Sequence, residues 1–187
     1  MPTHHCPRVA RPPLHFAWIL AAVLVFAAAC GGGADTPAER VADLGVQNVA
    51  EPVSGLITVA QPSRDQVEEL LDLGYDRFIS LQLTEEPGTG WEEAAIPAAG
   101  GHFARIPVAG PDDLTRENVD ALDALLAARG EEETVLYCAS SNRVGALLAL
   151  RAFWLQGADP EEAMSLGRRA GMRALEPAVR EIMAQGG

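Results

Sequence analysis

The stretch YCASSNR, at residues 137–143, decides how this chain folds. The residues before it, 134–137, are β-branched or aromatic enough to form a buried strand, and residues 144–155 have the length and composition of a helix. Cys138 is therefore expected at a strand-to-helix turn. The first N–H groups of a helix lack intrahelical partners, so this turn should stabilise a thiolate, a phosphate or a sulfate.

On both sides of this turn, short apolar runs alternate with helical stretches. Strands are expected at residues 46–49, 56–60, 78–83, 103–108 and 134–137, and helices at 64–73, 115–128, 143–155, 160–170 and 175–184. Such alternation is typical of an α/β fold, with a central and mostly parallel sheet between layers of helices. Ligands bind at the carboxyl ends of the strands in such sheets. The loops at 84–90, 109–114 and 138–143 are therefore the candidates for a site.

The amino-acid composition excludes several kinds of binding and catalysis. The chain has a formal net charge of −12 and no lysine, which argues against nucleic acid as a partner and against lysine-based covalent catalysis. Only His102 lies outside the N-terminal segment, so the usual histidine and cysteine sites for zinc cannot be assembled, and we expect neither metal nor cofactor. Of the three cysteines, Cys6 lies in the leader and Cys30 at its end. Cys138 remains as the free thiol.

The N-terminus has the pattern of an export signal. Two arginines precede an apolar run that ends in FAAAC at residues 26–30, which resembles the lipobox of bacterial lipoproteins. We expect a signal peptide at residues 1–29, a lipidated Cys30 followed by a flexible tether through residue 44, and one domain at 45–187. The protein would then be anchored in the cell envelope, on the periplasmic face of the outer membrane in a Gram-negative cell. An ordinary secretory signal is the alternative.

Four short motifs within the domain resemble those of a known protein family. They are AQPS at 60–63, FISL at 78–81, IPV at 106–108 and CASSNRVGAL at 138–147. Together they resemble the beta-lactamase-hydrolase-like phosphatases, bacterial relatives of dual-specificity and tyrosine phosphatases, over residues 46–171. The resemblance implies a phosphatase-like domain in which Cys138 forms a thiophosphate intermediate. It also implies that Arg143 clamps the phosphoryl oxygens and that the loop amides complete the cradle, from Ala139, Ser140, Ser141, Asn142 and Arg143.

A phosphatase also needs a group that protonates the leaving oxygen. Asp112 and Asp113 follow the IPV motif, near where dual-specificity phosphatases hold their aspartate, and are our first choice; Glu85 and Glu86 are the second. Alternatively, the two aspartates help to cap the helix that begins near Thr115.

Two features differ from the wider phosphatase pattern. Four residues separate Cys138 from Arg143, the loop length of rhodanese-type sulfurtransferases, and Ser141 stands where relatives generally have glycine. If the backbone at Ser141 takes a positive φ, serine costs roughly 1 kcal/mol or more relative to glycine.

Several functions therefore remain open. The leading one is hydrolysis of a phosphate-containing small molecule or a phosphoprotein. A rhodanese-like sulfurtransferase would carry a persulfide on Cys138, and an inactive phosphatase-like module would only bind an anion or a partner. Cys138 can also be an inert buried side chain. An arginine cluster at 168, 169 and 173 is most simply a solvated surface.

Overall fold

A five-stranded sheet forms the centre of the domain, in a computed structural model that describes residues 35–186. The strand order is β1-β2-β5-β3-β4, and every neighbouring pair is parallel except β1 and β2. This confirms the α/β fold and the mostly parallel sheet. The strands are β1 (Ala50–Val53), β2 (Leu56–Ala60), β3 (Tyr75–Ser80), β4 (His102–Arg105) and β5 (Glu133–Cys138).

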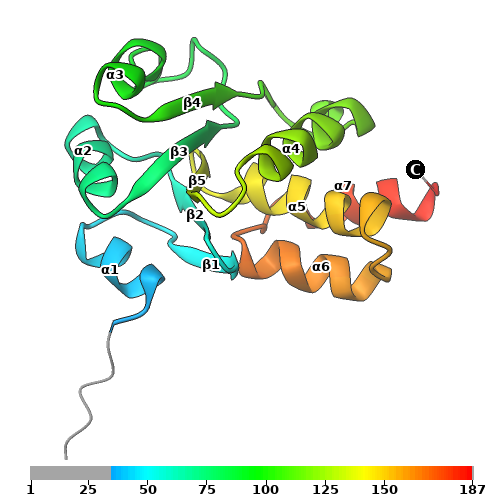
Figure 1. Cartoon of the computed structure of the whole chain (residues 1–187). Helices are drawn as coiled ribbons and strands as arrows, with labels where there is room; N and C mark the ends of the chain where they lie inside the picture. Colours follow the sequence, from blue (N-terminus) through cyan, green and yellow to red (C-terminus); the bar gives the residue numbers. More distant parts are fainter. Residues whose placement is uncertain (1–34, 187) are drawn as a thin grey trace, which may run out of the picture. The chain divides into compact units, whose positions relative to one another are not determined.

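Helices cover both faces of this sheet (Figure 1). One face packs against α1 (Pro37–Asp43), α2 (Arg64–Asp72) and α3 (Glu92–Ala98). The other packs against α4 (Arg116–Ala128), α5 (Asn142–Leu155), α6 (Pro160–Arg169) and α7 (Glu176–Ala184). A short 3₁₀ turn, η1 (Pro111–Asp113), precedes α4. Within residues 35–186, every helix is too short or too polar to traverse a bilayer.

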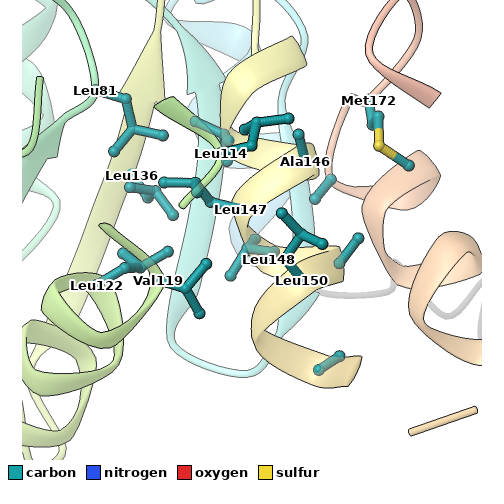
Figure 2. Close-up of a cluster of buried hydrophobic side chains, with 14 of the residues drawn as sticks. Leu81, Leu114, Val119, Leu122, Leu136, Ala146, Leu147, Leu148, Leu150 and Met172 are labelled. Atoms are coloured by element: carbon teal, nitrogen blue, oxygen red, sulfur yellow. The ribbon is translucent and has the colours of Figure 1, made fainter. Parts of the chain in front are cut away.

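Two hydrophobic cores lie on the two faces. On the face of α4 and α5, leucines of both helices pack against Leu81 and Leu136 (Figure 2). Side chains alternate along a strand, so Tyr137 belongs to the core under α1–α3 and Cys138 to the core under α4–α7. Cys138 therefore faces the side of the sheet on which α5 packs.

Two glycines set the distance between α5 and α6. A Cβ on Gly145 would overlap the backbone of Gly167 and Met172, and a Cβ on Gly167 would lie 2.7 Å from the carbonyl oxygen of Gly145. Side chains at these positions would force the helices apart. The close approach brings the C-terminal end of α6 next to residues 138–143, which we call the cysteine loop.

Several segments differ from the sequence prediction. Strands β3 and β4 begin and end earlier than the predicted 78–83 and 103–108. The predicted strand at 46–49 lies instead at Ala50–Val53, because Asn48 adopts a left-handed backbone (φ 55°) that interrupts an extended chain. Pro52 is tolerated there because β1 is an edge strand. Helix α3 was not predicted; it is short and contains Pro97.

The tether also ends earlier than expected. Helix α1 starts at Pro37, is capped by Thr36 and buries Val41 completely, so this part of residues 30–44 is folded. The sequence missed it because a single buried valine gives no helical periodicity. The predicted signal peptide and the lipidated Cys30 lie outside the described residues.

Candidate active site at the end of strand β5

Cys138 is the last residue of the central strand. It lies level with Ala60 at the end of β2, while Leu81 donates its backbone N–H to the carbonyl of Tyr137 on the other side. Helix α5 begins at Asn142, so the chain passes from strand to helix within three residues. This confirms the predicted strand–turn–helix arrangement and places the turn at the carboxyl edge of the sheet.

The backbone at Ser141 is left-handed, with φ 63°. This is the geometry for which glycine is the usual residue, so serine carries the conformational cost that its position predicts. The Ser141 side chain is fully buried and lies against Gly171, where a Cβ would overlap the Ser141 Cβ. Gly171 thus provides the space that Ser141 fills.

Side chains from outside the loop fix its shape. Asn48 donates from Nδ2 to the carbonyl of Ser140 at 3.2 Å, and its own carbonyl lies 3.5 Å from Ser141 Oγ. On the opposite flank, Asn142 Oδ1 accepts the backbone N–H groups of Arg173 at 2.8 Å and Leu175 at 3.3 Å. The cysteine loop is therefore held by the chain before β1 and by the chain after α6.

Arg143 is turned into the protein. Its Nη1 donates to Glu86 Oε1 at 2.5 Å and to the carbonyl of Val108 at 2.7 Å, and its Nη2 donates to Glu86 Oε2 at 2.7 Å. The hydrogen bond with Glu86 raises the pKa of Arg143, burial acts against this, and the nearby Cys138 sulfur raises the pKa further. Sulfur and guanidinium are thus close neighbours.

One edge of the Arg143 guanidinium remains available. A guanidinium has five N–H groups, and the bonds to Glu86 and Val108 use three of them. Among residues 35–186, Nε and the second N–H of Nη2 donate to no oxygen or nitrogen atom, and the Cys138 sulfur is the one further hydrogen-bonding neighbour of the guanidinium. These two groups form the parallel pair of donors that binds two oxygens of a phosphate or carboxylate.

Glu86 holds Arg143 in place and carries no proton at neutral pH. Its hydrogen bond with Arg143 lowers its pKa to about 2, burial opposes this, and the backbone N–H of Leu83 lowers it further. A carboxyl group with this pKa is ionised throughout the physiological range. Glu86, one of our second-choice acids, is therefore unsuited to protonate a leaving group, and Glu85 is exposed without a hydrogen-bond partner in the described chain.

Two glutamines complete the surroundings of Glu86. Gln82 is 1% exposed and donates from Nε2 to Gln61 Oε1 at 3.1 Å and to Glu86 Oε2 at 3.4 Å. Its Oε1 is buried and has no partner in the part of the chain described. The sequence analysis did not identify Gln82. The available signal was its position directly after an apolar strand, at the edge where ligands bind.

The two candidate acids differ in their contacts. Asp113 Oδ2 accepts the backbone N–H of Ala109 at 2.7 Å and so closes the turn that follows Val108. Asp112 is exposed and makes no side-chain hydrogen bond within residues 35–186. Thr115 caps α4 through its own side chain. The loop of Asp112 and Asp113 thus adjoins Arg143 through Val108, but neither carboxylate contacts the guanidinium.

Cys138 itself has no exposed surface. Ala139 and Ser140, the next two residues, are exposed, so the sulfur lies one layer below the surface of the loop. No group of three or more histidine, cysteine or acidic residues with the geometry of a metal site occurs in the described part of the chain.

The fold, but not the sequence, matches known proteins. No protein-family model matches the chain, and no curated protein matches its sequence. Among solved structures, a DUF442 protein from Shewanella putrefaciens CN-32, described as a candidate phosphatase, has a TM-score of 0.59 and 20% identity, covering 76% of this chain and 95% of that one. The chain shares the fold of this structure.

Two further structures agree. The core catalytic domain of the PP-IP phosphatase SIW14 from S. cerevisiae, in complex with citrate, has a TM-score of 0.54 and 18% identity, over 74% of this chain and 85% of that chain. TpbA from P. aeruginosa also has a TM-score of 0.54 and 18% identity, covering 76% of this chain and 86% of that one. These likenesses establish the fold.

Proposed function

We propose that this protein hydrolyses phosphate monoesters, with Cys138 as the nucleophile. The observation that carries the proposal is the inward Arg143, which Glu86 and Val108 hold beside the sulfur, with two N–H groups that donate to no oxygen or nitrogen atom of the described residues. A guanidinium fixed in advance stabilises the charge of a transferring phosphoryl group without reorganisation during the reaction. The phosphatase fold supports the same assignment.

In the first step, the Cys138 thiolate attacks phosphorus. A sulfur–phosphorus bond forms, the bond from phosphorus to the ester oxygen breaks, and the leaving oxygen takes a proton from Asp112. The free edge of Arg143 binds two phosphoryl oxygens, and the amides of residues 139–143 surround the third. Because Cys138 has no exposed surface, a group covering the sulfur must move when the ester binds.

In the second step, water attacks phosphorus and the sulfur–phosphorus bond breaks. The proton lost by water returns to the Asp112 carboxylate, and inorganic phosphate leaves. Gln82 Oε1 is a buried acceptor next to Glu86 and can accept a hydrogen bond from such a water.

The test is turnover of p-nitrophenyl phosphate by the full chain in detergent. Cys138→Ser should abolish turnover, and denaturing quench of the wild type should reveal a protein that has gained one phosphoryl group. Arg143→Lys removes the paired donors, whereas Arg151→Lys changes an arginine on the same helix that pairs with Asp123 at 2.7 Å. The proposal fails if Cys138→Ser retains activity or if both lysine variants behave alike.

An inactive anion-binding module is the second candidate, favoured by the complete burial of Cys138 and by the strained backbone at Ser141. It predicts that phosphate binds and that no ester is hydrolysed. A sulfurtransferase would instead release thiocyanate from thiosulfate and cyanide through a persulfide on Cys138. Running both assays on one preparation distinguishes the three functions.

We also propose that the domain acts in the cell envelope, attached through a lipid on Cys30. The support is the lipobox-like sequence at residues 26–30. Cells fed an alkyne fatty acid should label the wild type and Cys6→Ser but not Cys30→Ser. Label on Cys30→Ser, or none on the wild type, would overturn this assignment.

A further inference from the structure

A cavity of about 150 Å³ opens beside the cysteine loop, on the flank of β1 and α6. Ser140 of the loop lines it, together with Asn48 from before β1 and Gly171 from after α6. Two arginines also line it, Arg169 and Arg173, as do residues 49–50. None of these side chains takes part in the hydrogen bonds that hold Arg143. The cavity is therefore separate from the proposed catalytic contacts, although it shares the loop.

The packing of α6 explains why two arginines meet there. The Gly145–Gly167 contact brings the end of α6 to the loop, and the chain then turns at Gly171, whose φ is 104°. The backbone N–H of Arg173 donates to Asn142 Oδ1 at 2.8 Å. Arg173 Nη1 also donates to the carbonyls of Arg168 and Met172, at 2.9 and 2.7 Å. Its guanidinium is thereby held in position before any ligand binds.

The charges in the cavity are not balanced by carboxylates. Arg168 pairs with Glu161 at 3.9 Å and with Glu176 at 3.4 Å. By contrast, no carboxylate among residues 35–186 lies within 4.0 Å of the nitrogens of Arg169 or Arg173. Arg169 has only one side-chain bond in this region, from Nη1 to Ser165 Oγ at 2.9 Å. Arg40, Arg64 and Arg129 also have no ion pair within residues 35–186, but Arg169 and Arg173 line the same cavity.

We propose that this cavity is a second anion-binding site, which takes a phosphoryl group or inorganic phosphate. The Nε and Nη2 groups of both arginines have no hydrogen-bond partner in the described chain, and they offer the paired donors that phosphate oxygens fit. The polar residues Ser140 and Asn48 line the same cavity. This site does not depend on whether Cys138 is a nucleophile.

Binding is tested by titrating inorganic phosphate into the isotope-labelled full chain of Cys138→Ala and following the amide resonance of Gly171. We expect a saturable shift that Arg169→Ala/Arg173→Ala weakens about tenfold or more, because charge-assisted hydrogen bonds are lost. Arg40→Ala/Arg64→Ala is the matched control: it removes two exposed arginines outside the cavity and should bind as before. Equal affinity in both double variants would overturn the site, as would equal weakening.

A variant that loses its fold is recognised from its amide spectrum. In that event the single variant Arg169→Gln replaces the double variant in the test. It should fold, because Arg169 is exposed and its one described side-chain hydrogen bond is to Ser165. Several-fold weaker phosphate binding would support the site and unchanged binding would overturn it.

The source of the anion is a separate arm of the experiment. If the phosphoryl group belongs to the substrate, the wild type should hydrolyse 1,3-propanediol bisphosphate with a higher kcat/KM than the monophosphate, and Arg169→Ala/Arg173→Ala should remove this preference. If phosphate binds at Gly171 without any such preference, free phosphate is the ligand. Phosphate binding without turnover of any ester would overturn the proposed catalytic function but support the second anion site. Turnover without phosphate binding near Gly171 would support the catalytic function and overturn the second anion site.

Discussion

Arg143 and Glu86 are joined at two points, from Nη1 to Oε1 at 2.5 Å and from Nη2 to Oε2 at 2.7 Å. The pair links the first turn of α5 to the loop after β3, so it connects two of the three loops that meet at the carboxyl edge of the sheet. The third loop joins through the Val108 carbonyl, which accepts from the same Nη1 at 2.7 Å. One guanidinium therefore holds the whole site together and still keeps one edge for an anion.

Replacing Glu86 by glutamine should lower stability in a pH-dependent way. The folded pKa of Glu86 is about 2, below the value of about 4.3 in an unfolded chain. A lowered pKa adds stability that is fully present above about pH 4.3 and is lost as the pH falls towards 2. At neutral pH, Glu86→Gln should lose about 2 kcal/mol of unfolding free energy.

Urea denaturation at several pH values checks this. The difference between wild type and Glu86→Gln should shrink below about pH 4. Glu85→Gln changes the exposed neighbour and should match the wild type. A difference that stays constant down to about pH 2 would show that the ion pair is not its cause.

Replacing Ser141 by glycine should stabilise the protein. The left-handed backbone at Ser141 (φ 63°) costs a serine about 1 kcal/mol relative to glycine. The bond that glycine would lose, from Ser141 Oγ to the Asn48 carbonyl, is long at 3.5 Å and so contributes little. We expect thermal unfolding of Ser141→Gly at a higher temperature, with turnover preserved or increased. A lower Tm would mean that the contact of Ser141 with Gly171 outweighs the backbone cost.

Replacing Gly145 by alanine should destabilise the domain by about 1–3 kcal/mol or more, because the added methyl group overlaps the backbone of α6. It should also displace Arg169 from the cavity beside the cysteine loop. Gly110→Ala is the control, since a Cβ there meets nothing within 4 Å and φ is −172°. Denaturant midpoints of both variants provide the measurement, and similar midpoints would refute the close-packing argument.

The sequence predicted those parts that depend on local patterns. Helix α4 begins at Arg116, next to the predicted start at Thr115, and Cys138 ends a strand directly before a helix. Contacts between distant loops have no such pattern. Nothing near Glu86 in the sequence distinguishes it from Glu85, yet only the side chain of Glu86 reaches Arg143, fifty-seven residues away.

The arginines after α5 are a second case in which a local sequence pattern does not predict a contact between distant segments. The cluster at 168–173 was expected to be a solvated surface, and for Arg168 the ion pairs with Glu161 and Glu176 fit a surface role. Arg169 and Arg173 line a cavity because Gly145 and Gly167 let α6 approach α5. That close approach is possible because the two glycines have no side chains. A pattern of hydrophobic residues does not reveal such a contact.

Variants of Asp112 and Asp113 should differ in how their activity depends on the leaving group of the ester. Asp113 closes the turn through the N–H of Ala109, so Asp113→Asn should weaken the loop and change the hydrolysis of all esters similarly. The Asp112 carboxyl group makes no hydrogen bond within residues 35–186, and as the acid it contributes about 10²–10⁴-fold to rates when the leaving oxygen needs a proton. Asp112→Asn should therefore lose most activity on an alkyl phosphate and little on p-nitrophenyl phosphate, whose leaving group departs as the anion. The kcat ratio of the two esters measures this, and a leaving-group effect in Asp113→Asn alone would transfer the role to Asp113.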